Sequence, residues 1–248
     1  MTKPNFPQTP TANRLSPVPD PVLDAIRPLL SRQERVLVAI DGRCGAGKTT
    51  LAARLQAELP CRVFHMDDFF LQPYQRTPER LQAPGENVDH ERFLQEVLLP
   101  AARGEGVVYR PYLCAREVLG PAVFVPPARL TIVEGSYACH PALWPYYHLR
   151  IFLTVDPREQ LRRIEARSGP EKLRQFIDRW IPLEEQYFQA CSLAERCDFS
   201  WEDEPADQNL LNFPVYFFSF LVYIAQFLPP FFGAAFFQKD SLFLKNPV

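Results

Sequence analysis

Apolar positions in this chain fall into two alternating patterns, short apolar runs and stretches with helical spacing. Runs rich in apolar and β-branched residues predict buried strands, at Val36–Ile40, Cys61–Met66, Arg129–Val133 and Leu149–Val155. Helical spacing predicts helices, at Pro21–Arg32, Thr50–Leu59, Glu91–Ala102, Asp156–Arg167, a further stretch up to Trp180, and Pro182–Cys191. Strands that alternate with helices are typical of an α/β fold with a mainly parallel sheet.

Three further features complete the predicted organisation. Gly106–Tyr112 and Glu117–Val125 predict two strands that pair as a hairpin outside the main sheet, and Cys197–Trp201 predicts a last short strand. Residues 1–21 are rich in Pro, Thr and Asn and predict a mobile tail. We therefore expect one folded domain over residues 22–204, followed by an apolar, aromatic-rich segment over residues 205–248.

The clearest candidate for a binding site follows the first strand, within the stretch VLVAIDGRCGAGKTTL. Its glycines allow the backbone N–H groups to curl around a phosphate, and the helix that follows adds its positive N-terminal end. The Lys48 amine would reach the β- and γ-phosphates, and the Thr49 hydroxyl would bind Mg²⁺. The sequence therefore predicts a nucleotide site made by Gly42, Arg43, Cys44, Gly45, Ala46, Gly47, Lys48, Thr49 and Thr50.

The composition of the chain limits the classes of protein to which it can belong. The chain has 248 residues, a formal net charge of −2 and 47% hydrophobic residues, so it predicts a globular protein and gives no reason to expect a nucleic-acid partner. Six cysteines lack metal-binding spacing. Because Cys44 lies inside the phosphate loop and no signal sequence begins the chain, we expect a reducing, cytoplasmic location.

Acidic residues occur where the predicted strands end. Asp67 and Asp68 follow the second strand, and Glu134 closes the third. Ligands of such sheets lie at the carboxyl ends of the strands, and phosphoryl transfer needs carboxylates near the nucleophile and around Mg²⁺. A turn or a helix cap is the alternative role for the aspartate pair.

A basic element follows the fourth strand. Arg163 and Arg167 lie one helical turn apart and share a helix face. They are candidates for a lid that stabilises the transferred phosphate and excludes water. The alternative is a solvated charged face, which we prefer for Arg158.

These motifs together resemble the uridine kinase and phosphoribulokinase group of P-loop kinases. The resemblance rests on DGRCGAGKTT, HMDDFF, NVDHERF, IVEGSY and LTVDPREQLRRIEAR, in that order, over roughly residues 34–200. It implies ATP- and Mg²⁺-dependent phosphorylation of a hydroxyl on a small molecule, typically the 5′-hydroxyl of uridine or cytidine.

The resemblance also implies roles for individual residues. Asp67 matches the general base and Mg²⁺ organiser, and Glu134 matches the acidic residue of the Walker-B strand. Asp89 matches an aspartate that holds ribose hydroxyls, although a helix N-cap is its plain alternative. The substrate side would include Asp68, Phe70, Asp89 and Tyr112, with Arg163 and Arg167 as lid arginines.

The sequence departs from this group near the base-reading position. Tyr112 is kept, but Leu113 stands where an acid is expected, and no histidine follows nearby. A kinase of pantothenate or of a sugar therefore stays open. A non-catalytic P-loop switch protein also stays open, and Asp67 is the residue that disfavours it.

The end of the chain differs from the rest, because Gln208–Gln238 contains no charged residue. We expect a non-native or loosely docked ending, so that a chain ending near Asp207 keeps its activity. The alternatives are a membrane anchor through residues 210–237, or an apolar helix that packs on the domain or on the second subunit of a homo-oligomer.

Overall fold

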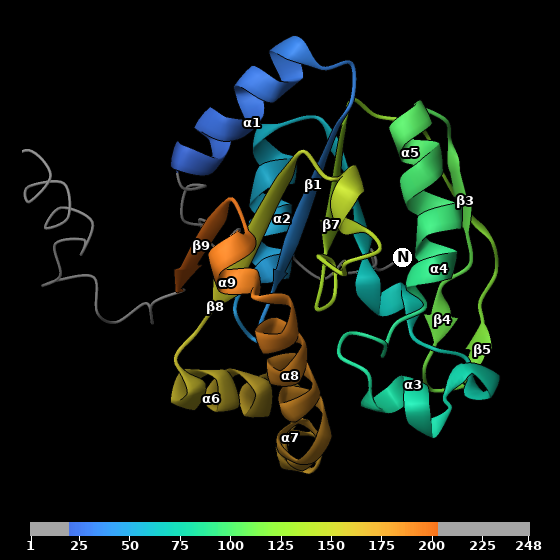
Figure 1. The fold of residues 1–248 in the computed structure, drawn as a ribbon, viewed down its shortest axis with the longest axis vertical. Coiled ribbons are helices and arrows are strands. Elements are labelled where there is room, and N and C mark those ends of the chain that lie inside the picture. The colour runs from blue at the N-terminus through green and yellow to red at the C-terminus, as the bar shows by residue number, and fades with distance from the viewer. Residues whose placement is uncertain (1–19, 203–248) are drawn as a thin grey trace, which may run out of the picture. The chain divides into compact units, whose positions relative to one another are not determined.

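A parallel sheet forms the centre of the computed structural model, which describes residues 20–202. Its strands, in spatial order, are β2 (Cys61–His65), β7 (Leu130–Glu134), β1 (Val36–Gly42), β8 (Leu149–Thr154) and β9 (Phe199–Glu202). Strand β1 lies in the middle, with Val36 opposite Leu130 of β7 and Val38 opposite Leu149 of β8. Every residue of β1 is buried. The α/β fold with a mainly parallel sheet is confirmed (Figure 1).

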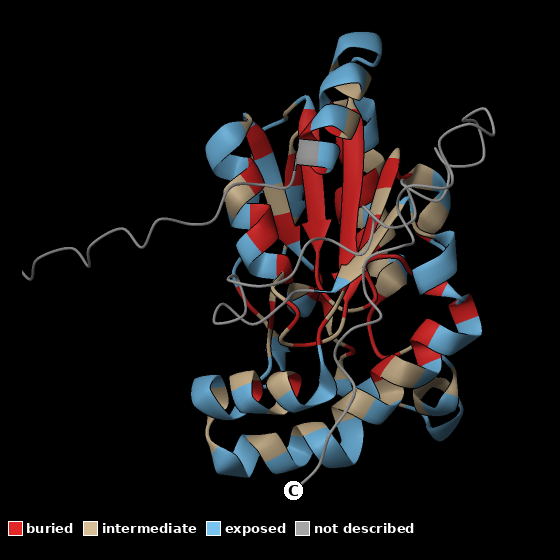
Figure 2. Ribbon diagram, turned by 90° about the vertical axis from the view of Figure 1, so that its left-hand side faces the viewer, coloured by how far each residue is buried: buried red, intermediate tan, exposed pale blue. Residues whose placement is uncertain are grey.

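Helices cover both faces of this sheet because the strand side chains alternate between them. Val36, Val38 and Ile40 pack in a cluster with helices α1 (Asp20–Arg32) and α2 (Lys48–Glu58). Leu37 and Ala39 point the other way, into a cluster with the helices around Phe93 and Tyr187. Figure 2 shows the buried strands between helices whose outer surfaces are exposed.

Two of the predicted helices contain a wider π-type turn just before a proline. The first comprises α4 (His90–Phe93), η3 (Leu94–Leu98) and α5 (Leu99–Arg103); the second comprises α7 (Pro170–Gln175), η5 (Phe176–Trp180) and α8 (Ile181–Cys191). A proline inside a helix lacks an N–H and clashes with the carbonyl four residues earlier. The wider turn before Pro100 and Pro182 accommodates both effects. The separation expected between Trp180 and Pro182 is therefore wrong, because the helix continues across it.

The helix after β8 begins as the sequence predicts. Helix α6 (Pro157–Ser168) is capped by Asp156, whose carboxylate accepts hydrogen bonds from the backbone N–H groups of Arg158 and Glu159. Helix α1 also matches its prediction and continues through Pro28. The other helices within residues 20–202 are short, namely η1 (Met66–Phe69), η2 (Pro73–Gln75), α3 (Pro78–Gln82), η4 (Trp144–Tyr146) and α9 (Leu193–Arg196).

The predicted hairpin lies outside the main sheet. It forms two antiparallel ladders, β3 (Val107–Tyr109) with β6 (Val123–Val125) and β4 (Tyr112–Leu113) with β5 (Val118–Leu119). In Figure 1 these strands lie beside α4 and α5, away from β8 and β9.

Two predictions concern parts of the chain outside residues 20–202. The N-terminal tail lies almost wholly there, and so do the apolar segment over residues 205–248 and its membrane alternative. Within the described residues, none of the helices combines the length and the apolar character that crossing a membrane requires.

Candidate active site

The phosphate loop leaves the carboxyl end of β1 and leads directly into α2. Gly47 precedes the helix with a φ of 87°, which is left-handed backbone that glycine adopts without strain. Gly42 is required for a different reason, since a Cβ there would lie 1.9 Å from the Leu153 carbonyl oxygen on β8. Helix α2 begins at Lys48, two residues before the predicted start, so the loop ends at the helix N-terminus where an anion binds well.

Lys48 is held inside the loop. Its ammonium donates hydrogen bonds to the carbonyl oxygens of Gly42, at 2.6 Å, and Arg43, at 2.9 Å, and to the Ser136 hydroxyl at 3.3 Å. The side chain is buried apart from a small exposed fraction. These contacts place one positive charge at the centre of the loop.

Thr49, the residue after Lys48, contacts Glu134. The Thr49 hydroxyl lies 3.1 and 3.2 Å from the two carboxylate oxygens of Glu134, which is buried at the end of β7. His65 lies against the same carboxylate, with Nδ1 2.5 Å from Oε1, and this hydrogen bond raises the pKa of His65. Sequence reasoning missed His65.

Asp67 lies in η1, the short helix directly after β2, and lines the same cavity as Lys48, Thr49 and Glu134. The pKa of Asp67 is raised, chiefly because the surrounding protein desolvates the carboxylate. The nearby acid Glu134 acts in the same direction, whereas the Lys48 charge opposes it. One hydroxyl and two carboxylates are oxygen ligands of the kind that Mg²⁺ takes, so Thr49, Asp67 and Glu134 fit this ion.

These residues surround a cavity of about 780 Å³. The phosphate loop forms one wall of it, and cations from α6 and α7 form another, namely Arg163, Arg167 and Lys172. Arg163 donates to the Gly45 carbonyl oxygen at 3.0 Å and to Glu159 at 2.7 Å. The Arg167 guanidinium lies 5.8 Å from the centre of the Phe176 ring. Both predicted lid arginines therefore face the cavity, and Lys172 is an addition that sequence reasoning missed.

Glu184 is a second functional candidate that sequence reasoning missed. It comes from α8, is 5% exposed, and lines the cavity. Its carboxylate accepts hydrogen bonds from the Cys44 backbone N–H at 3.0 Å and from the Ser136 hydroxyl at 2.6 Å. In the sequence it is one acid among several on an ordinary helix, so no local signal marks it.

Other loop residues are arranged around this contact. The Arg43 guanidinium forms an ion pair with Glu185 at 2.7 Å, which directs it away from the cavity. Burial raises the pKa of the Cys44 thiol to about 12, so the thiol stays protonated. Thr50 lines the main cavity, and both Ala46 and Thr50 line a further cavity of about 370 Å³.

The residues predicted to bind the substrate lie in different environments. Phe70 lines the main cavity and also a smaller cavity of about 210 Å³, which Tyr112 lines too. Asp68 accepts a hydrogen bond from the Tyr109 hydroxyl at 3.1 Å. Neither Asp68 nor Asp89 lines these two cavities.

In this structure Asp89 is a helix N-cap, which was the alternative to ribose binding. Its carboxylate caps α4 by accepting from the Arg92 backbone N–H at 3.1 Å, and it lies 3.4 Å from the Arg92 guanidinium. Its ribose-binding role stays a prediction.

Asp41, directly before the loop, is a buried carboxylate that connects β1 to the segment after β7. It accepts hydrogen bonds from the backbone N–H groups of Gly42 (2.6 Å), Tyr137 (3.2 Å) and Cys139 (2.7 Å) and from the Tyr187 hydroxyl (2.9 Å). Burial raises the pKa of Asp41 to about 6. This network positions the backbone that follows Glu134.

Three potential metal ligands gather beside this segment, within 4.8 Å of one another, namely Glu86, His90 and His140. The two imidazole rings stack at 3.9 Å, and carboxylate oxygens of Glu86 lie 3.2 Å from His90 Nε2 and 3.5 Å from His140 Nε2. The His140 Nδ1 already accepts from the Ala142 N–H at 3.2 Å, so its proton is on Nε2 and no lone pair there is free for a metal. Burial lowers the pKa of His140 to about 4, so the ring is neutral at pH 7.

No protein-family model matches the chain. Two solved structures are similar over most of its length. One is a possible uridine kinase from Bacillus stearothermophilus, 20% identical, with a TM-score of 0.52, over 73% of this chain and 99% of the other. The other is YFH7 from Saccharomyces cerevisiae, described as a proposed P-loop kinase with a circular permutation, 11% identical, with a TM-score of 0.51, over 75% of this chain and 99% of the other.

At these identities the similarity concerns the fold. The chain therefore has the fold of these P-loop kinase structures.

Proposed function

We propose that the protein transfers the γ-phosphoryl group of ATP to a hydroxyl of a small molecule, with a nucleoside such as uridine or cytidine as the first candidate. One observation carries this proposal. The cavity that contains the phosphate loop also contains the Asp67 carboxylate, and it adjoins the smaller cavity beyond Phe70 and Trp180. A phosphoryl donor and an acceptor could therefore share the cavity that contains this carboxylate.

Each role that phosphoryl transfer requires can be assigned to residues of this site. The loop N–H groups and Lys48 would hold the phosphates, and Thr49, Asp67 and Glu134 would hold Mg²⁺, which neutralises phosphate charge when bound. Asp67 would accept the proton of the acceptor hydroxyl. Arg163 and Arg167 face the loop across the cavity, where cationic groups stabilise the charge of the transferred phosphoryl group.

Kinases of pantothenate or of a sugar are the alternatives within this class, since the loop and the carboxylates serve any hydroxyl. A non-catalytic ATP-binding switch is the alternative outside it. A switch needs phosphate and Mg²⁺ contacts but no base that faces a second substrate. Asp67 lies in a cavity that adjoins a second one, and this favours the kinase.

The test is release of ADP from ATP and Mg²⁺ in the presence of uridine, cytidine, pantothenate or simple sugars. We expect release that depends on one acceptor and yields its phosphorylated product. ATP binding without acceptor-dependent ADP release from any of these compounds would support the switch protein instead. The cytoplasmic location belongs to the same proposal, supported by cysteines that are all free thiols.

A further inference from the structure

Ser136, two residues after Glu134, brings a hydroxyl of the protein itself to the main cavity. The residue is partly exposed, and it lines the cavity together with Lys48 and Glu184. A serine hydroxyl is a nucleophile when a neighbouring group takes its proton. The contacts of Ser136 therefore decide what this hydroxyl can do beside a bound nucleotide.

The Ser136 hydroxyl donates its proton towards a buried carboxylate. It lies 2.6 Å from Glu184 Oε1, which is a short hydrogen bond, whereas its other acceptor, the Gly42 carbonyl oxygen, is 3.4 Å away. The hydroxyl has only one proton, so the shorter bond takes it. The proton is therefore directed at a group that can accept it during a reaction.

The phosphate loop holds Glu184 in this orientation. The second oxygen of its carboxylate accepts from the Cys44 backbone N–H at 3.0 Å, and the residue is 5% exposed. A hydroxyl within hydrogen-bond distance of a base, which a third group orients in turn, is the recurring geometry of activated nucleophiles. The alternative is a structural role, in which Glu184 only joins α8 to the loop.

Lys48 connects this hydroxyl to the phosphates of the nucleotide. Its ammonium donates to Ser136 Oγ at 3.3 Å, and it is the group proposed to hold the β- and γ-phosphates. A phosphate that Lys48 binds would therefore lie beside Ser136 Oγ. The Lys48 charge would also stabilise the negative charge that develops when the two groups react.

Thr49 also carries a hydroxyl beside a carboxylate, but its surroundings fit a different role. Its hydroxyl lies 3.1 and 3.2 Å from the two oxygens of Glu134, and these two residues form, with Asp67, the set that fits Mg²⁺. Binding of the metal would engage the Thr49 hydroxyl. Ser136 is not part of this set.

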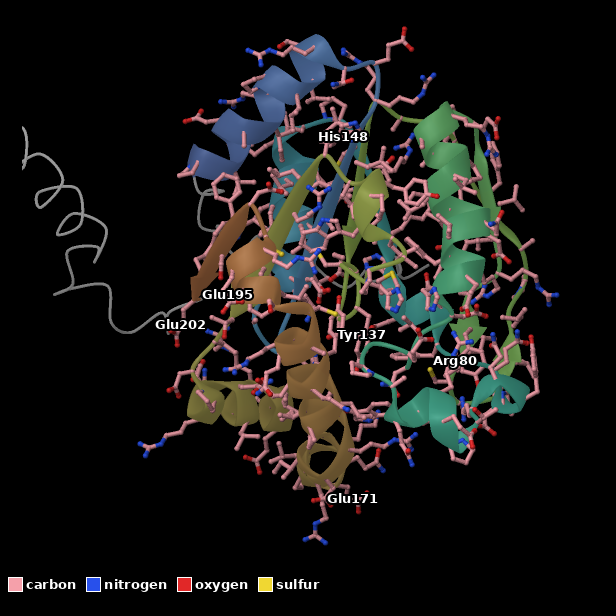
Figure 3. The ribbon with its side chains drawn as sticks, viewed as in Figure 1. Arg80, Tyr137, His148, Glu171, Glu195 and Glu202 are labelled. Carbon is pink, nitrogen blue, oxygen red and sulfur yellow. The ribbon has the colours of Figure 1, made fainter. Side chains whose placement is uncertain are left out.

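The backbone directly after Ser136 is strained. Tyr137 has a φ of 74°, a left-handed value that a bulky residue rarely adopts. Its backbone N–H donates to the buried Asp41 carboxylate at 3.2 Å, and Figure 3 shows its side chain in the interior beside α8, the helix that carries Glu184. Strain of this kind is typical of catalytic and binding sites. Here it fixes the segment that presents Ser136 to Glu184.

We propose that Ser136 is a second phosphoryl acceptor of this site, so that the protein phosphorylates itself when no small-molecule acceptor is bound. Ser136 Oγ forms a bond to the γ-phosphorus of ATP, and the bond from that phosphorus to the β–γ bridging oxygen breaks. ADP leaves with the electron pair of the broken bond, and the hydroxyl proton goes to the Glu184 carboxylate. This inference rests on the ATP binding of the proposed function, and not on the acceptor that Asp67 would serve.

The test is incubation of the purified full chain with Mg²⁺ and ATP that carries a radioactive γ-phosphate, without acceptor. We expect label on Ser136, located by mass spectrometry of peptides, that approaches one phosphate per chain. Labelling should stop there, because phosphoserine adds a charge of about −1.5 to −2 beside Lys48, where the nucleotide phosphates would bind. The rate constant should not depend on protein concentration, since Ser136 lines the cavity of its own chain.

Two variants test the chemistry, and a third is the matched control. Ser136→Ala should remove the label. Glu184→Gln should lower the initial rate of labelling by about 10²–10⁴-fold, the range of a positioned proton acceptor. Its Kd for ATP should stay close to that of wild type, because glutamine keeps the size of the side chain and an oxygen for the Cys44 N–H. Ser200→Ala should label as wild type does, since Ser200 on β9 lines a different cavity.

ATP binding without label on Ser136, or label on another residue instead, overturns the inference. So does label that persists in Lys48→Ala, because the reaction then occurs outside this site, or an equal rate in Glu184→Gln and wild type. Label on Ser136 without acceptor-dependent ADP release supports the inference and contradicts the small-molecule kinase. Acceptor-dependent ADP release without label on Ser136 overturns the inference alone, and failure of wild type to bind ATP overturns both.

Discussion

Replacement of Asp67 by Asn tests the assignment of the catalytic base most directly. The change keeps the size of the side chain and removes its negative charge beside Lys48 and Glu134. Removal of a positioned proton acceptor lowers kcat by about 10²–10⁴-fold, which corresponds to about 2.7–5.4 kcal/mol of transition-state stabilisation. We expect kcat to fall within this range.

The effect on stability should have the opposite sign. The pKa of Asp67 is raised in the folded protein, chiefly by desolvation, so the fold prefers the protonated carboxyl. The stability that this group contributes is present at low pH and is lost as the pH rises through the folded pKa. At pH 8 the neutral amide of Asp67→Asn should therefore raise the Tm of the ligand-free protein.

The assay measures kcat by acceptor-dependent ADP release, together with the Tm by thermal unfolding. Asp68→Asn is the comparison, because the same change occurs one residue later at a carboxylate that accepts from the Tyr109 hydroxyl and does not line the cavity. It should lower kcat less than about tenfold, within the range of a single neutral hydrogen bond. Wild-type kcat in Asp67→Asn, or equal losses in the two variants, would refute the reasoning.

Three further changes test other parts of the site. Lys48→Ala should lower kcat by about 10²–10³-fold, since one electrostatic donor to the transferred group contributes about 3–4 kcal/mol, and wild-type turnover would contradict the nucleotide site. Asp89→Ala should lower the free energy of unfolding by about 1 kcal/mol through loss of the α4 cap, whereas a selective rise in the KM for a ribonucleoside would favour ribose binding. The pKa of His140 falls from 6.5 to about 4 on folding, so the stability that its neutral ring provides is lost as the pH falls from 6.5 to 4. The carboxyl of Asp41, whose pKa is raised to about 6, has the opposite effect on stability over this pH range. The effect of His140 is therefore measured as the unfolding free energy of wild type minus that of His140→Asn, in which the contribution of Asp41 cancels. This difference should decrease by roughly 3 kcal/mol between pH 7 and pH 4.

The sequence alone determined the scaffold and the nucleotide loop. Hydrophobic runs marked the strands because a strand buried on both faces is mostly apolar, as β1 is from Val36 to Ile40. The loop between Gly42 and Thr49 could be recognised because its chemistry depends on residues that are neighbours in the chain. The start of α6 was predictable for the same reason, since Asp156 caps a helix that begins at the next residue.

Tertiary structure decided which polar side chains face the cavity. Glu184 reaches the phosphate loop from 140 residues away, and the Tyr187 hydroxyl reaches Asp41 from 146 residues away, so no local spacing records either contact. Within NVDH, sequence spacing treats Asn87 and Asp89 alike as polar residues before a helix. Only packing distinguishes them, because the fold pairs the Asp89 carboxylate with α4 and Arg92 and places the Asn87 amide beside the Tyr137 hydroxyl.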